Sequence, residues 1–223
     1  MIRNALKIRG FTLSEVLITL GIIGVVAAFT IPVLMREYQE YQLKQAAKTA
    51  YSKAYQAIQQ MKQDEGGTLK HFENNFRTFK PIFMTYFKVI KNCGWASCVT
   101  RDDDPESDTY SFSLYKTLAG NYAEGWRLDD GQFITSDGMF WGIENESGGY
   151  GVIMITVDVN GYLKLPNVYG KDVFMFQILR DNLVPMGIDG TIYPANLNHC
   201  SRSSSSPNSG FGCMYYVLKD INY

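Results

Sequence analysis

Four cysteines are the clearest candidates for covalent chemistry in this 223-residue chain. They fall into two local pairs, Cys93 with Cys98 and Cys200 with Cys213. An even number of closely spaced cysteines suits an oxidising compartment, where thiols pair as disulfides. Zinc binding is the weaker alternative, because neither spacing is a tight ligand turn and the chain has only 2 histidines. The sequence therefore predicts two disulfides and a location outside the cytoplasm.

Signatures of enzymatic chemistry are absent from the sequence. It has no glycine-lysine phosphate loop, no Gly-x-Ser-x-Gly elbow and no paired-histidine metal helix. His71 and His199 stand alone, and no triad partner can be assigned to either, so we expect surface or packing roles for both. The only chemistry that we expect is performed on this protein, and the sequence predicts a non-enzyme.

Charge is distributed unevenly along the chain. Arg3, Lys7 and Arg9 lie in the first ten residues, and the remainder carries 18 basic and 22 acidic residues. Nucleic-acid binding needs a basic stripe that neutralises several phosphates, and no such cluster follows the N-terminus. DNA and RNA are therefore not expected partners.

Glu15 is the single charge in an apolar or small run of 24 residues, from Phe11 to Leu34. A helix of this length reaches about 36 Å, enough to cross a hydrocarbon layer of about 30 Å. The basic residues before it should stay in the cytoplasm, which places the rest of the chain outside. Because a carboxylate in a spanning helix costs about 3 kcal/mol, something should compensate Glu15.

Two explanations of Glu15 stay open. The carboxylate could lie near the interface and reach water. Alternatively, cleavage between Gly10 and Phe11 would free a cationic amine that pairs with Glu15 of a neighbouring subunit. An ordinary signal peptide, cut near Val26-Ala27-Ala28, is a rival interpretation of the whole segment. It is disfavoured by Glu15 itself and by the apolar run, which continues to Leu34.

The N-terminal residues resemble a known family. A short basic leader, Gly10, the run Phe11-Thr12-Leu13-Ser14-Glu15 and an apolar stretch are similar to the type IV prepilin and type II secretion pseudopilin signature. The resemblance implies that a prepilin peptidase cuts after Gly10 and methylates Phe11, and that Glu15 guides subunit addition. It also implies a helix kink at Pro32, where a backbone donor is missing; a simple helix boundary at the membrane edge is the alternative.

The remaining sequence predicts an α+β, pilin-like architecture with a long N-terminal helix and a small antiparallel sheet. We expect a leader at residues 1–10, a membrane and filament-core helix at 11–34, an amphipathic helix at 35–66, and a globular head at 67–223. Apolar residues recur at helical spacing in the amphipathic segment, and Gly66-Gly67 signals its end. Short strands are expected at Gln132–Thr135, Met139–Ile143, Gly151–Val157 and Val173–Leu179.

Two earlier stretches of the head are less regular. Residues 70–99 have a mixed pattern, and within them residues 76–92 are expected to form a helix broken at Pro81. Residues 101–108, RDDDPESD, are expected to form a charged surface loop rather than a cation site.

The segment from Ile155 to Ile178 is similar to a head motif of the pseudopilin-like group. Major pseudopilins carry calcium in their head loops, and Asp158, Asn160 and Asp172 offer oxygen ligands suited to that ion. The alternative is that these residues serve the backbone of tight turns. Calcium is the one candidate cofactor. The loop closed by Cys200 and Cys213 looks like the stapled C-terminal loop of many type IV pilins, which contributes to subunit contacts or binding.

The resemblance implies a structural subunit of a type IV pilus or a type II secretion pseudopilus. The alternatives are a minor pilin whose head is an adhesive or substrate-binding module, and an enzyme on an uncleaved anchor. Expected partners are the prepilin peptidase, other copies or homologous pilins in a helical filament, the inner-membrane assembly platform and membrane lipid. The expected location is the inner membrane, as a single pass with a cytoplasmic N-terminus and a periplasmic head, and then a periplasmic pseudopilus or an extracellular pilus.

Overall fold

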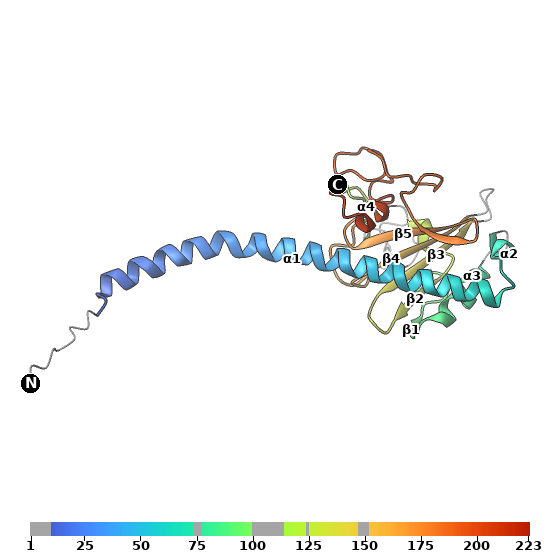
Figure 1. Ribbon diagram of the computed structural model, residues 1–223, viewed down its shortest axis with the longest axis horizontal. Coiled ribbons are helices and arrows are strands. Elements are labelled where there is room, and N and C mark those ends of the chain that lie inside the picture. Colours follow the sequence, from blue (N-terminus) through green and yellow to red (C-terminus); the bar gives the residue numbers. More distant parts are fainter. Residues whose placement is uncertain (1–9, 74–76, 100–113, 124, 147–151) are drawn as a thin grey trace, which may run out of the picture. The chain divides into compact units, whose positions relative to one another are not determined.

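The computed structural model describes residues 10–73, 77–99, 114–123, 125–146 and 152–223 (Figure 1). The charged segment 101–108 lies outside the described residues. The chain divides into two compact units, Met1–Tyr41 and Gln42–Tyr223. The second unit contains the sheet and the disulfides, and the first contains the apolar part of the N-terminal helix.

Helix α1 runs from Leu13 to Asp64. It continues through Pro32 without a break in the helix, so the alternative of a boundary at Pro32 is wrong; a kink there stays a prediction. The helix ends where Gly66 and Gly67 adopt positive φ angles of 79° and 94°, and the N–H of Gly67 donates to the carbonyl of Lys62 at 2.7 Å. Glycine adopts this conformation without steric cost, which explains the stop at this point.

The last part of α1 packs on the sheet through small and apolar side chains. These recur three or four positions apart, so they lie on one side of the helix. All are buried: Ala47, Ala50, Ala54, Ala57, Ile58 and Met61. Alanines at the contact allow the helix backbone to approach the sheet closely.

Six strands of the described residues form one antiparallel sheet in the order β1-β2-β3-β4-β5-β6. Sequential neighbours are paired throughout, and this includes β1 and β2, which are far apart in the sequence. The α+β class predicted from the sequence is confirmed. The strands are β1 (Val89–Asn92), β2 (Gln132–Thr135), β3 (Phe140–Glu146), β4 (Val152–Asp158), β5 (Val173–Leu179) and β6 (Asn182–Pro185).

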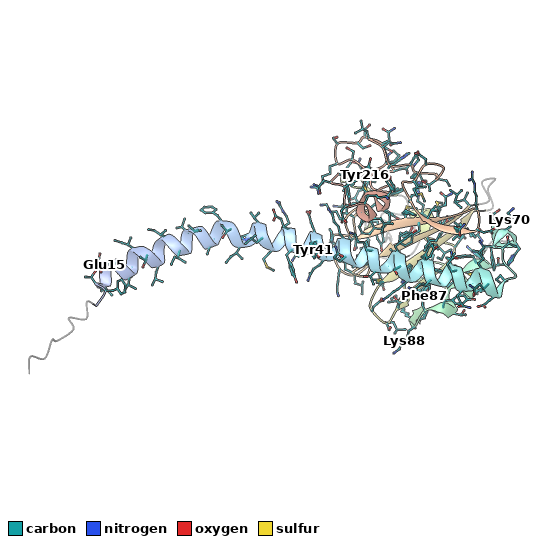
Figure 2. The ribbon with its side chains drawn as sticks, in the orientation of Figure 1. Glu15, Tyr41, Lys70, Phe87, Lys88 and Tyr216 are labelled. Atoms are coloured by element: carbon teal, nitrogen blue, oxygen red, sulfur yellow. A yellow bond between two sulfur atoms is a disulfide. The ribbon has the colours of Figure 1, made fainter. Side chains whose placement is uncertain are left out.

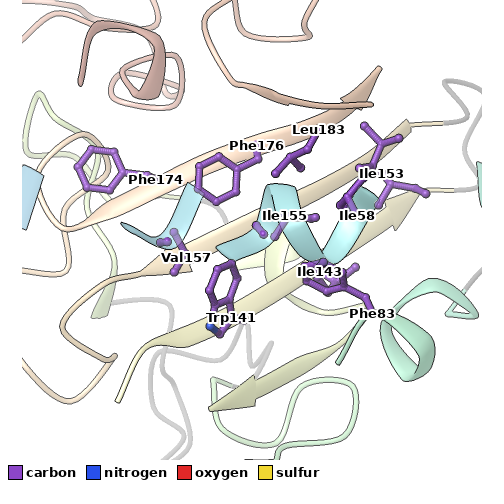
Figure 3. Packing of buried hydrophobic residues seen from close by; sticks show 14 of the residues in the cluster. Ile58, Phe83, Trp141, Ile143, Ile153, Ile155, Val157, Phe174, Phe176 and Leu183 are labelled. Carbon is purple, nitrogen blue, oxygen red and sulfur yellow. The ribbon is translucent and has the colours of Figure 1, made fainter. Parts of the chain in front are cut away.

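The core lies on both faces of this sheet. On one face, alternate residues of β3, β4 and β5 pack against α1; Figure 3 shows Ile58 among them. They are Trp141, Ile143, Ile153, Ile155, Val157, Phe174 and Phe176. The other face packs against loops and short helices, including η3 (Gly125–Leu128), and its apolar residues include Phe140, Met154, Met175, Tyr169 and Phe211.

The helix predicted at residues 76–92 is only partly right. After α2 (Lys70–Glu73), the described residues form two short helical pieces, α3 (Phe79–Phe83) and η1 (Met84–Tyr86), and then strand β1. Pro81 does not break α3, because it lies in the first turn, where its missing N–H has no intrahelical partner. Residues 89–92 are extended because they pair with β2, a contact that local sequence does not reveal. Helix α4 (Met214–Leu218) follows the second disulfide.

Candidate functional site

Residues 10–15 form an exposed N-terminal segment followed by a capped helix start. Gly10 and Phe11 precede α1, and Phe11 is 87% exposed. The side chain of Glu15 accepts hydrogen bonds from the N–H and the hydroxyl of Thr12, both at 2.8 Å. The Thr12 hydroxyl in turn accepts from the N–H of Glu15 at 3.2 Å. This reciprocal arrangement is a capping box, and it satisfies two backbone donors that the first helical turn would otherwise leave unpaired.

The helix after this cap presents an apolar surface that no other described part of the chain covers. An 18-residue window near the N-terminus has a mean hydropathy of 2.5, and none of it is buried. Its side chains point outward along the helix in Figure 2. By length and composition the helix can cross a membrane. An uncovered apolar surface of this size marks contact with lipid or with other helices.

The three calcium candidates lie together at the end of β4 and the loop that follows it. Asp158 and Asp172 are fully buried. Asp158 accepts hydrogen bonds from the N–H of Gly161 at 2.9 Å and from the hydroxyl of Tyr115 at 3.0 Å. Asp172 accepts from the N–H groups of Asn167 and Val168, at 2.8 Å and 2.7 Å.

These contacts are those of carboxylates that hold a loop in place. The amide of Asn160 likewise donates to the carbonyls of Lys164 and Leu165. N–H groups that point at a carboxylate present positive dipole ends to it, and this is the turn-forming role expected of Asp and Asn. Burial, and then the charge of Asp172, raise the pKa of Asp158 to about 7. Calcium binding by the three residues stays a prediction.

Both disulfides that the cysteine spacing predicts are present. Cys93 is bonded to Cys98, and Cys200 to Cys213. The second one closes the serine-rich loop against the face of the sheet opposite α1, because Phe211, within that loop, packs on Tyr169 with ring centroids 4.3 Å apart. The loop is therefore part of the head core.

The two histidines make local contacts. The ring of His71 lies 3.1 Å from the carboxylate of Glu65, and Nδ1 of His199 lies 3.1 Å from the carbonyl of Pro194. Neither of these contacts joins a nucleophile to a base, which is the geometry that triad chemistry requires.

A cluster of three carboxylates was missed in the sequence. Asp129 and Asp130 lie between η3 and β2, and Glu144 lies on β3; one oxygen from each falls within 4.8 Å of the others. Asp130 accepts from the N–H of Asn145 at 3.1 Å and from Nε of Arg77 at 3.4 Å. The only signal in the sequence is an acidic residue at a position of β3 that alternation assigns to a buried face.

Glu144 has a strongly raised pKa. The residue is only 4% exposed. Burial, and then the charges of Asp130 and Asp129, raise the pKa of Glu144 to about 10. Burial also raises the pKa of Asp130, although the hydrogen bond from Asn145 opposes that shift.

Comparison with known proteins gives one match. The family described as the prokaryotic N-terminal methylation motif matches residues 6–31. The searches of curated proteins and of solved structures found no match to this chain. The matched residues include Gly10, Phe11, the Thr12–Glu15 cap and most of the uncovered apolar helix. Residues 6–31 are therefore the N-terminal signature of type IV pilins and pseudopilins.

Proposed function

We propose that this chain is a structural subunit of a type IV pilus or a type II secretion pseudopilus. The observation that carries the proposal is the methylation motif at residues 6–31 at the start of a helix whose apolar surface is uncovered. Such a surface needs a second apolar environment, first lipid and then the helices of other subunits. The partners are the prepilin peptidase, other pilin subunits and the inner-membrane assembly platform.

Processing begins with hydrolysis of the peptide bond between Gly10 and Phe11 by the prepilin peptidase. Both residues are exposed and precede the first helical residue, so the bond is not part of a hydrogen-bonded helix. Hydrolysis releases residues 1–10 and creates an α-amine on Phe11, which is then methylated. With Arg3, Lys7 and Arg9 retained in the cytoplasm, the head lies in the periplasm before assembly.

Glu15 changes partners during assembly. In the single chain its carboxylate caps the helix through Thr12. When subunits stack, the Phe11 amine of a neighbour supplies a cation for the same carboxylate. The pair lies in an apolar environment, where attraction between opposite charges is strong but is partly offset by the loss of hydration. Glu15 thus sets the register between neighbouring helices.

N-terminal sequencing and intact mass of the purified chain test the processing step. The expected first residue is Phe11, with one added methyl group. A first residue near Phe29 would establish an ordinary signal peptide, and a start at Met1 would establish an uncleaved anchor. Abundance distinguishes a main filament subunit, which is made in large excess, from a minor pilin.

Two substitutions separate the charge of Glu15 from its capping role. Glu15→Gln keeps an oxygen that can accept from Thr12, since glutamine also serves in capping boxes, whereas Glu15→Ala removes it. We expect both variants to be processed and inserted normally, because the loss of a charge favours the lipid phase. Both should yield few or no sheared filaments. Normal filament yield in Glu15→Gln would refute the ion-pair role and leave Glu15 as a helix cap.

A further inference from the structure

The cluster of Asp129, Asp130 and Glu144 lies in a part of the head that sequence resemblance does not reach. Glu144 comes from the middle of the sheet, on the face opposite α1, where the neighbouring strand presents Met154 beside it. Leu128 covers Gly142, two residues earlier on the same face, so η3 holds the two aspartates over the strand. Three carboxylates are thus gathered from two segments that the fold itself brings together.

The carboxylate of Glu144 is not explained by the contacts that surround it. Its Oε2 atom is buried, and among the described residues no hydrogen-bond donor lies within reach of it. The whole residue is 4% exposed, and one of its carboxyl oxygens lies within 4.8 Å of an oxygen of each aspartate. A buried carboxyl oxygen without a partner destabilises the fold, and a cation bound at this point would supply the partner.

The spacing of the three carboxylates fits a single ion. Their oxygens lie within 4.8 Å of one another. Two ligands on opposite sides of a calcium ion, each at about 2.4 Å, are separated by about 4.8 Å, so all three oxygens can reach one centre. Arg77 contacts Asp130 and offsets part of the negative charge of the cluster, and a divalent ion would offset more of it.

We propose that Asp129, Asp130 and Glu144 bind a divalent cation, calcium in preference to magnesium. The donors are all carboxylate oxygens, the ligands that hard cations select. Magnesium holds its water more tightly and demands a smaller octahedron, which a buried set of three protein carboxylates supports less well. The ion joins the turn before β2 to the middle of β3 and so fixes η3 on the sheet.

Isothermal titration of the metal-free mature chain in detergent micelles with CaCl2, and separately with MgCl2, tests the proposal. We expect one saturable calcium site per chain and weaker binding of magnesium. Glu144→Gln keeps the volume of the side chain and removes a ligand charge, and it should weaken calcium binding at least about tenfold. Asp129→Asn, at a half-buried position, should weaken it too and serves if Glu144→Gln does not fold.

Thermal unfolding gives a second readout, because the substitution should stabilise the metal-free chain but should abolish the stabilisation by calcium. Without metal, Glu144→Gln should unfold at a higher temperature than the parent, because a neutral amide replaces a carboxyl group whose ionised form is disfavoured by burial and by the neighbouring aspartates. Calcium should then raise the unfolding temperature of the parent and leave that of Glu144→Gln unchanged. If the Glu144 side chain served only packing, Glu144→Gln would not be more stable than the parent without metal, and calcium would not change the unfolding temperature of the parent.

Two control variants locate the ion. Asp189→Asn changes an exposed aspartate and should leave calcium binding unchanged. Asp158→Asn removes a carboxylate of the loop predicted from the sequence to bind calcium, and it should also leave this site intact. The proposal is overturned if the parent shows no saturable calcium binding, if Glu144→Gln binds calcium as the parent does, or if only Asp158→Asn abolishes binding. Since the titration needs no filament, its failure would not affect the proposed function.

Discussion

On the face of the head sheet that packs against α1, the buried side chains of strands β3, β4 and β5 are apolar, such as Trp141, Ile155 and Phe176, except for Asn145 near the end of β3. On the opposite face the same strands also present buried polar side chains. These are Glu144 on β3, Thr156 and Asp158 on β4, and Gln177 on β5. The first face is covered by a helix and the second by loops, a short 3-10 helix and the disulfide-closed segment.

The type of structure that covers each face of the sheet explains this difference. A helix satisfies its own backbone hydrogen bonds, so a sheet needs to offer it only apolar surface. A loop that becomes buried brings N–H and C=O groups that need partners. Gln177 accepts from the N–H of Ile192 at 2.9 Å, and Asp172 accepts from two loop N–H groups. Polar side chains on the loop-covered face therefore replace the hydrogen bonds that a helix would supply for itself.

Truncation of Phe176 should have the largest effect, because the helix-covered face depends mainly on packing. Phe176 is fully buried, and its ring lies 5.6 Å from the ring of Tyr51 on α1. Phe176→Ala should lower the free energy of unfolding by about 4 kcal/mol through lost burial and the cavity that remains. Urea unfolding of the mature chain in micelles measures the change. Phe176→Leu should cost clearly less, and equal losses in the two variants would contradict the packing explanation.

Gln132 tests the opposite face, because its four hydrogen bonds all go to backbone groups. Its oxygen accepts from the N–H groups of Cys98 and Val99, at 3.1 Å and 2.9 Å. Its amide donates to the carbonyls of Val99 and Leu128, at 2.6 Å and 2.9 Å. Gln132→Leu should lower the free energy of unfolding by about 3 kcal/mol, although leucine is more apolar, because buried backbone groups lose their partners.

The same substitution at an exposed site is the control for Gln132. Gln56 lies exposed on α1, and Gln56→Leu should change the free energy of unfolding by less than about 0.5 kcal/mol. If Gln132→Leu were as mild as Gln56→Leu, the loops would not depend on polar side chains of the sheet. The contrast between the two faces would then have another cause.

The helix-covered face could be predicted from the sequence more fully than the other. Residues 132–135 and 173–179 were predicted as strands with the observed bounds, and the helical stripe from Ala47 to Met61 is buried as its spacing indicates. Both patterns are local, with a period of two or of about 3.6 residues. The short strands β1 and β6 were missed: β1 is mostly exposed and so shows no alternation of buried and exposed residues, and β6 ends in a proline, which counts against a strand.

The loop-covered face could not be predicted because its contacts join residues far apart in the chain. From the sequence, Gln132 is an ordinary polar residue at the start of a strand, yet three of its four hydrogen bonds go to Cys98 and Val99, more than thirty residues away. Asp129, Asp130 and Glu144 come together only once η3 is placed on β3. The N-terminal site is the reverse case: Gly10, Phe11 and Glu15 are neighbours in the sequence, and so their motif could be recognised directly.

Loss of the disulfide between Cys200 and Cys213 should loosen the serine-rich loop on the loop-covered face of the sheet without detaching it. The bond between Cys200 and Cys213 closes a loop with a sequence separation of 13. The double variant Cys200→Ser/Cys213→Ser should lower the free energy of unfolding by about 2 kcal/mol, mainly because the unfolded chain gains freedom. The bond between Cys93 and Cys98 closes a smaller loop, with a sequence separation of 5, so its loss should lower the free energy of unfolding by less. The opposite ranking would show that the serine-rich loop is held by its packing alone.

The smallest expected effect concerns Asp181, which contacts the chain just after the end of α1. Just after α1, the N–H of Leu69 and the hydroxyl of Thr68 donate to the carboxylate of Asp181, at 2.7 Å and 3.0 Å. Asp181 belongs to the two-residue turn between β5 and β6, where Arg180 and Asp181 both have positive φ angles. So even beside the helix-covered face, a side-chain-to-backbone contact appears as soon as the chain leaves the helix.

This contact makes stability depend on pH in the acid range. The hydrogen bond from Leu69 lowers the pKa of Asp181, further helped by Thr68 and opposed by burial. A lowered pKa means that the unfolded chain takes up the proton more readily, so the contribution is present above the ordinary aspartate pKa of about 4 and is lost as pH falls below it. Because the carboxylate is largely hydrated, the contribution should stay below about 1 kcal/mol. The difference in urea midpoint between the parent and Asp181→Asn should therefore shrink between pH 6 and pH 3, whereas Asp189→Asn, at an exposed aspartate, should show no such trend. A difference for Asp181→Asn that is constant across this range would show that Asp181 acts through the shape of its turn and not through its charge.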